Sequence, residues 1–167
     1  MDFLEMYAAE FDLEMKSTRR MLESVPEEQM SWRPHEKSML LARLASHVAE
    51  LPYRAAQVIE LEALVRQPGF TPYIAASKEE LLKKFDETSE AARKAIAVAS
   101  EEHLKQTWAV KFGEKTILEM PRAMALRRIV MDHLIHHRGQ LSVYLRLLDV
   151  PVPGMYGPSA DETPLMK

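Results

Sequence analysis

The chain contains no cysteine. It therefore has no disulfide bond, no thiolate nucleophile of its own, and no zinc-ribbon or iron–sulfur site. Any thiol chemistry would need a thiol from outside the protein. With 167 residues, the chain can bury a hydrophobic core without a disulfide or a structural metal, and we expect one domain over residues 1–167.

The chain also lacks an excess of positive charge. It has 22 Lys and Arg residues and 25 Asp and Glu residues, for a formal net charge of −3. Binding to a phosphate backbone requires a basic surface, so we expect no nucleic-acid partner. No segment approaches the roughly 18 uninterrupted apolar residues of a membrane span, and acids interrupt the apolar N-terminal segment. We expect a cytoplasmic protein without a membrane partner.

Glycine is rare, with five in the chain, and long stretches follow the 3.6-residue period of helices. This pattern predicts an all-α protein, a four-helix bundle with a long irregular connection before the last helix. The helices are expected at about residues 2–24, 38–66, 77–100 and 121–148. Residues 101–120 lose the period and form either an irregular crossover or a short hairpin. Residues 148–167, rich in Pro and Gly, form a non-helical tail.

Several local signals refine these boundaries. Asp2 is placed to cap the first helix, and Ser77 with Glu80 three residues later predicts a capping box. Pro52 falls inside the second helix, where its missing N–H predicts a kink. Trp32 lies in the loop between the first two helices and is expected to anchor that loop to the body.

Three histidines interrupt the apolar faces of the predicted helices. His133 and His137 are four residues apart in the last helix, so they lie one above the other on one face, and His47 occupies an inward position of the second helix. Neutral imidazole is the commonest ligand for transition metals. Burying two imidazoles costs several kcal/mol unless something satisfies them, which a metal does. The alternative, core histidines bonded to carbonyl groups, stays open at this point.

The remaining patterns exclude two metal chemistries. Leu134 stands where the HExxH motif of zinc metalloproteases has its catalytic Glu, and the chain lacks the two Glu-x-x-His motifs of a di-iron bundle. Peptide hydrolysis and di-iron oxygen activation are therefore disfavoured. His136 points away from His137, His35 and His103 fall in predicted loops, and we assign none of these three a role.

Four segments together resemble the DinB family, also called the DinB/YfiT-like metalloenzymes. They are SWRP at residues 31–34, LASHVAEL at 44–51, HLIHHRGQLSVYLRLL at 133–148 and DVPVPGMYGPSAD at 149–161. The resemblance extends over nearly the whole chain. It implies a metal site with three histidine ligands at His47, His133 and His137, and it implies a homodimer.

The resemblance also implies a chemistry. An open three-histidine site suits a catalytic divalent metal, with zinc or nickel first and iron or manganese also compatible. Some family members are transferases or isomerases that use low-molecular-weight thiols such as bacillithiol or mycothiol. This implies a metal-dependent transferase acting on a small-molecule substrate with such a thiol. The alternatives are a hydrolase using metal-bound hydroxide and a non-catalytic metal-binding or structural bundle.

The group that moves protons in such an enzyme is not identified by the sequence. Glu50 follows His47 by about one turn, and Glu14 and Tyr7 could approach the site from the first helix, although a solvated face is the commoner role for such residues. Arg138 and Gln140, which belong to the resembling motif, are expected to fasten the last helix to the loop or to a partner subunit.

Overall fold

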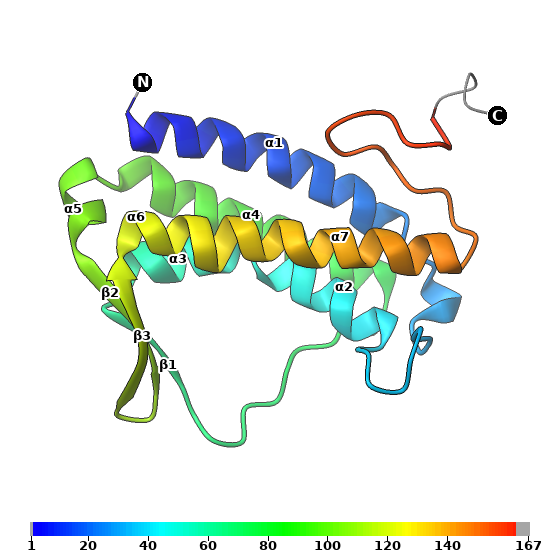
Figure 1. Cartoon of the computed structure of the whole chain (residues 1–167), viewed down its shortest axis with the longest axis horizontal. Helices are drawn as coiled ribbons and strands as arrows, with labels where there is room; N and C mark the ends of the chain where they lie inside the picture. The colour runs from blue at the N-terminus through cyan, green and yellow to red at the C-terminus, as the bar shows by residue number, and fades with distance from the viewer. Residues whose placement is uncertain (1, 163–167) are drawn as a thin grey trace.

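The computed structural model describes residues 2–162 and is mostly helical. Its helices are α1 (Phe3–Glu23), α2 (Leu41–Glu50), α3 (Tyr53–Glu60), α4 (Lys78–Val98), α5 (Glu101–Lys105), α6 (Arg122–Ala125) and α7 (Asp132–Leu147). A 3₁₀ turn, η1, covers Glu27–Gln29, and a π-helical segment, η2, covers Leu126–Met131. The long helices run side by side along the longest axis of the molecule (Figure 1). The prediction of a mainly helical protein is confirmed, but the structure also contains a small sheet.

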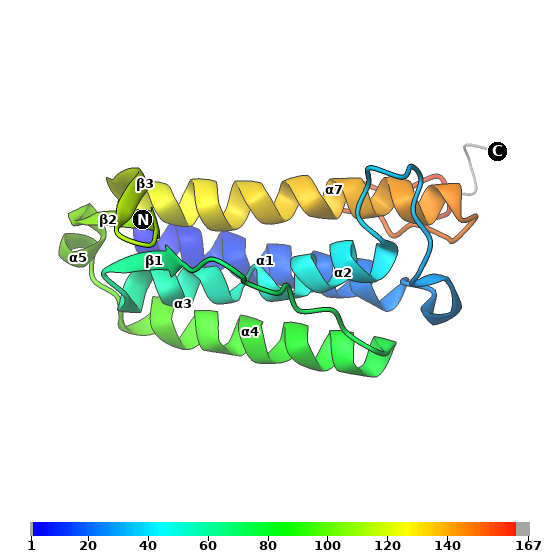
Figure 2. The ribbon, with the colours of Figure 1, turned by 90° about the horizontal axis from the view of Figure 1, so that it is seen from below.

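A small three-stranded sheet lies at one end of the molecule (Figure 2). It contains β1 (Ala63–Arg66), β2 (Thr107–Phe112) and β3 (Lys115–Pro121), in the order β1-β2-β3. β2 and β3 form an antiparallel hairpin whose turn contains Gly113, at φ 56°. The hairpin was one of the two alternatives for residues 101–120. β1 pairs in parallel with β2, Ala63 opposite Ala109.

The second predicted helix is shorter than expected and is broken once. Instead of running from residue 38 to 66, the chain forms α2, an interruption at Leu51–Pro52, and α3, which ends at Glu60. The kink predicted at Pro52 is confirmed, because proline has no N–H to continue the helical hydrogen bonds. The last four residues were assigned wrongly: they pair with β2, and a partner so distant in sequence is invisible to helical periodicity.

The predicted N-cap residues of α1 and α4 are confirmed, but the capping box predicted for α4 is only half formed. Asp2 accepts a hydrogen bond from the Glu5 amide at 2.9 Å, and the Glu5 carboxylate accepts one from the Asp2 amide at 3.2 Å. Ser77 accepts from the Glu80 amide at 3.1 Å. The Glu80 carboxylate accepts instead from Ala76, one residue before the position that a capping box requires.

The last helix contains a π-helical segment that helical periodicity did not reveal. α6, η2 and α7 follow one another without a gap from Arg122 to Leu147, and η2 holds one extra residue per turn. The fully buried positions of α7 are Leu134, Arg138, Leu141 and Leu145. His133 and His137 lie beside this line and are half-buried. They therefore border the core instead of occupying its centre.

Two non-helical segments are tied to the body. Trp32 packs edge-on against Tyr144 of α7, with ring centroids 5.6 Å apart, so the predicted loop anchor is confirmed. Residues 148–162 of the tail are non-helical as predicted, and Arg146 pairs with Asp161 at 2.5 Å. The predicted tail extends to residue 167, and its last five residues lie outside the described part. Within residues 2–162, no helix has the length and apolar character needed to cross a membrane.

Candidate metal centre

The fold brings His47 of α2 together with His133 and His137 of α7. One ligand nitrogen from each ring lies within 4.8 Å of the others. The ring centroids are 5.1 Å apart for His47 and His133, 4.7 Å for His47 and His137, and 4.7 Å for His133 and His137. These are the three residues that the sequence singled out. Their arrangement could hold one metal ion.

Each imidazole is neutral near pH 7 for reasons visible in the structure. Burial lowers the pKa of His47 to about 3, helped by the charges of His137 and Arg43. Burial and the neighbouring His137 lower the pKa of His133 to about 4, and burial also lowers the pKa of His137. Only a neutral imidazole has a lone pair for a metal, so this environment prepares the three rings as ligands.

In each imidazole, the hydrogen bond made by one ring nitrogen decides whether the other nitrogen has a lone pair for a metal. His137 Nδ1 lies 2.7 Å from Oε1 of Gln140, to which it donates, and its Nε2 is thereby left as an acceptor. His133 forms a hydrogen bond to the backbone of Ile129. Gln140 was expected only to fasten the helix. Its contact with His137 assigns it a role in orienting that ring.

His47 has a different environment, because its neighbour is a cation. Arg43 Nη2 lies 3.5 Å from His47 Nδ1 and can only donate, which favours a proton on Nε2. From there the proton can be donated to His133 Nε2 at 3.3 Å. Binding a metal at His47 Nε2 would move this proton to Nδ1, and Arg43 would have to turn away. The three donors thus fit a metal, with Arg43 as the group that must adjust.

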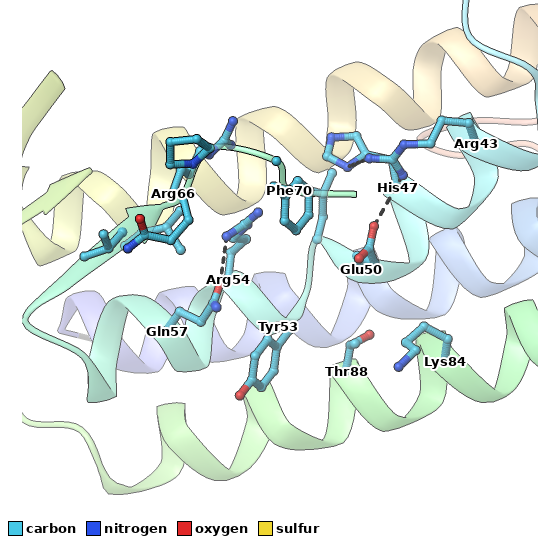
Figure 3. Close-up of a pocket in the computed structure, with 16 residues that line it drawn as sticks. Arg43, His47, Glu50, Tyr53, Arg54, Gln57, Arg66, Phe70, Lys84 and Thr88 are labelled. Carbon is cyan, nitrogen blue, oxygen red and sulfur yellow. Dashed lines mark hydrogen bonds and ion pairs between the residues drawn. The ribbon is translucent and has the colours of Figure 1, made fainter. Parts of the chain in front are cut away.

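A cleft of about 620 Å³ reaches the cluster at His47. Figure 3 shows residues that line it, which come from α2, α3 and α4, from β1 and from the segment that follows β1. Phe70 lies in that following segment and is 69% exposed. The cleft is within the size range of small-molecule sites.

Glu50 lies in this cleft and is the acidic group associated with the cluster. Its carboxylate is 3.3 Å from Arg43 Nη1 (Figure 3). Burial raises the pKa of Glu50, although Arg43 acts in the opposite direction. A raised pKa makes a carboxylate a stronger base, which is the property that a general base needs. Of the three proton-moving candidates from the sequence, Glu50 is the one in the cleft.

The other two candidates have structural contacts. The hydroxyl of Tyr7 donates to the carbonyl of Leu126 at 3.3 Å, and burial strongly raises the pKa of this hydroxyl. Glu14 is buried and lies 2.6 Å from Arg138. Arg138 was expected to fasten the last helix to the loop or to a partner subunit. Within the chain it instead contacts α1 and the tail, through Glu14 and Tyr156.

The remaining histidines lie outside the cluster. His136 is exposed, but its ring does not point away from His137 as expected, because the two ring centroids are 4.9 Å apart. His35 lies in a loop, as predicted. His103 was expected in a loop but belongs to α5, where its Nε2 lies 2.7 Å from the carbonyl oxygen of Ile59. Sequence reasoning missed Arg54 and Arg66, which also line the cleft. No motif marks them, since arginines on helix and strand surfaces are ordinary.

Known proteins of one family are similar to this chain. The model of the DinB family matches residues 1–165. The uncharacterized protein YrdA of Bacillus subtilis strain 168 is 24% identical over 160 residues, covering 95% of this chain and 91% of that protein.

Solved structures agree in fold. A DinB-like protein from Bacillus cereus ATCC 10987 has a TM-score of 0.71 at 20% identity, covering 91% of this chain and 97% of its own. The DinB-like protein YjoA of Bacillus subtilis has a TM-score of 0.66 at 21% identity, covering 91% and 99%. A candidate DinB member from Exiguobacterium sibiricum 255-15 has a TM-score of 0.63 at 20% identity, covering 98% and 99%. Because the family model spans nearly its whole length, this chain belongs to the DinB family.

Proposed function

We propose that His47, His133 and His137 bind one divalent cation and that the protein is a metal-dependent enzyme acting on a small molecule. The observation that carries the proposal is the convergence of three neutral imidazoles beside a cleft of about 620 Å³. Three nitrogen donors leave coordination positions open, as in catalytic zinc sites. Zinc or nickel is the first expectation, and iron or manganese is also compatible, because such a donor set selects weakly among these metals.

For the reaction, we favour group transfer with a low-molecular-weight thiol. A divalent cation at this site would lower the pKa of a thiol or a water molecule bound to it, which supplies a nucleophile near neutral pH. The chain has no cysteine that could act as the nucleophile itself. The cleft has room for a small thiol and a second small molecule.

The side chains around the cluster have separate tasks in this proposal. His133 and His137 are held at a fixed spacing by α7, and Gln140 orients His137 through its Nδ1. Glu50 accepts the proton that the incoming thiol or water releases, since burial raises the pKa of its carboxyl. Arg43, 3.3 Å from Glu50, holds that carboxylate in place.

A hydrolase is the second candidate, and Glu50 is the observation that favours it. A carboxylate beside a three-histidine site is also suited to take a proton from water, and hydrolysis would need no thiol. The same residues would serve both reactions. The two candidates therefore differ in the co-substrate they need.

Metal content is the first test. Elemental mass spectrometry on protein purified without an affinity tag should find about one equivalent in the wild type. His133→Ala and His137→Ala should lose most of it while the helical circular dichroism persists. His35→Ala is the control, because His35 is an exposed loop histidine outside the cluster. A wild type that stays empty after incubation with zinc and nickel would overturn the proposal.

Activity then separates the reactions. Turnover of a model electrophile such as chlorodinitrobenzene that needs both metal and thiol would support the transferase. Hydrolysis of an activated ester that needs metal alone would support the hydrolase. A metal-loaded protein inactive in both assays would favour a non-catalytic ion.

We further propose that α1, α2 with α3, α4, and α6 with α7 form a four-helix bundle, that residues 1–167 are one domain, and that the protein is a homodimer. A hydrophobic core with residues from all these segments supports the four-helix bundle and the single domain. The homodimer is supported by exposed apolar side chains on α6 and α7, namely Met124, Val143 and Leu147. Light scattering should give twice the chain mass, and the mass of one chain would contradict the dimer.

A further inference from the structure

The cleft beside the histidines carries an excess of positive charge. Its charged lining residues are Arg43, Arg54, Arg66, Lys84 and Glu50. Among the described residues that line it, Glu50 is the sole carboxylate. The whole chain has a formal charge of −3, so this excess is local and opposite in sign to the whole. A cleft lined by one sign of charge concentrates ligands of the other sign.

Two of the four cations already have partners. Arg43 Nη1 lies 3.3 Å from Glu50 and 3.3 Å from the carbonyl oxygen of Tyr73. Lys84 Nζ lies 3.9 Å from Glu87 and 5.1 Å from the centre of the Tyr73 ring. The positive charges of Arg43 and Lys84 therefore already have partners within the protein.

Arg54 and Arg66 are different. Arg54 is half-buried, and its Nη1 donates to the neutral Oε1 of Gln57 at 2.9 Å. Within residues 2–162, no ion pair joins Arg54 or Arg66 to a carboxylate. Burial, and then the charge of Arg66, lower the pKa of Arg54, while the charge of Glu50 acts in the opposite direction. Arg54 is half-buried and Arg66 is exposed, so solvent screens part of the repulsion between them, and an anion bound to both would offset the rest.

The two arginines are placed to act together with the histidines. Arg54 and His47 both line the same cleft, so a ligand in it could contact both side chains. In Figure 3, Arg54 and Arg66 lie on one side of Phe70, while His47 and Glu50 lie on the other. One end of the cleft therefore holds Arg54 and Arg66, and the other holds His47 with Glu50 and Arg43.

We propose that Arg54 and Arg66 form a subsite for an anionic group, a carboxylate or phosphate, of a substrate whose reactive part lies at the histidine cluster. Guanidinium groups suit this task, because their planar forks donate paired hydrogen bonds to both kinds of anion. The inference rests on the proposed function and deepens it. It assigns the substrate to the class of small organic anions.

Calorimetric titration of the metal-free full-length protein at low ionic strength tests this subsite. Succinate and inorganic phosphate are the anionic probes, and succinamide is the uncharged analogue of the former. We expect at least one anion to bind and succinamide not to bind. Arg54→Gln and Arg66→Gln should each weaken anion binding by roughly tenfold, the usual loss for a charge-assisted hydrogen bond. Arg33→Gln is the matched control, since Arg33 is exposed and outside the cleft lining.

The outcomes are separable from those of the metal test. Tighter binding of phosphate would indicate a phosphate-bearing substrate, and tighter binding of succinate a carboxylate-bearing one. Failure of both anions to bind, or equal binding by Arg54→Gln and wild type, would overturn the subsite. Because the titration uses metal-free protein, anion binding with no metal uptake would leave the subsite standing and refute the metal centre alone.

Discussion

Two polar clusters lie among the helices, and neighbouring residues of α7 belong to different ones. His137 belongs to the histidine cluster, and Arg138 belongs to a second cluster with Glu14, Thr18 and Tyr156. Successive residues of a helix point about 100° apart, so one helix can serve both. The first cluster is half-buried beside a cleft, and the second connects α7 to α1 and the tail.

The two clusters differ in whether their groups complement one another. Arg138 is a cation 2.6 Å from a buried carboxylate, and it also donates to Thr18 Oγ1 at 3.0 Å and to the Tyr156 hydroxyl at 2.8 Å. The three histidines all carry the same imidazole group, and one nitrogen from each lies within 4.8 Å of the others. Complementary groups fasten helices, whereas like groups gathered around one point suit a ligand from outside.

The largest effect is expected from breaking the complementary cluster. Arg138→Met leaves the Glu14 carboxylate buried without its cation, so the free energy of unfolding should fall by about 3–5 kcal/mol. Urea denaturation followed by circular dichroism measures this loss. The double variant Glu14→Leu/Arg138→Met should recover most of it, because both charges are gone. A loss below about 1 kcal/mol in the single variant would show that the pair does not fasten α7.

A smaller effect is expected from acidifying the metal-free protein. The pKa of His47 is lowered to about 3 and that of His133 to about 4, while an unfolded histidine titrates near 6.5. Below pH 6.5 the unfolded chain binds more protons than the folded one, so stability falls as the pH falls towards those values. Between pH 7 and 5 we expect a loss of about 2 kcal/mol, after discounting for partial exposure.

Urea denaturation at a series of pH values measures this dependence, and its slope should become shallower in His133→Leu. This range is chosen because most carboxylates stay ionised above pH 5. A metal-free stability that does not change from pH 7 to 5 would mean that the histidines are not held neutral by the fold.

The smallest effect is expected from Gln140→Leu. This change removes the acceptor 2.7 Å from His137 Nδ1 but leaves all three imidazoles in place. Loss of such an orienting partner typically weakens metal binding by about 10- to 100-fold. Zinc titration against a competing chelator measures the affinity, and Ser142→Ala, two residues from Gln140 and outside the cluster, is the control. Unchanged affinity would reduce Gln140 to the fastening role expected from the sequence.

Local patterns predicted much of this fold and failed where distant partners decide. The capping residue Asp2 and the break at Pro52 were predictable, because each acts on its own neighbours in the chain. Strand β1 was not, since it depends on pairing with β2. The π-helical segment before Asp132 also escaped prediction. Its extra residue per turn alters the face on which the following residues lie.

The candidate site likewise has some features that the sequence predicted and others that only the structure revealed. The sequence by itself determined the three histidines, the absence of a protein thiol and the family, because these depend on residue identity and on spacing along a helix. Only the tertiary structure decided that the histidines border a cleft, that Glu50 shares it, and that Arg54 and Arg66 lie there without carboxylate partners in the described chain. Burial, electrostatic fields and cleft shape arise between elements far apart in the chain, which local spacing does not encode.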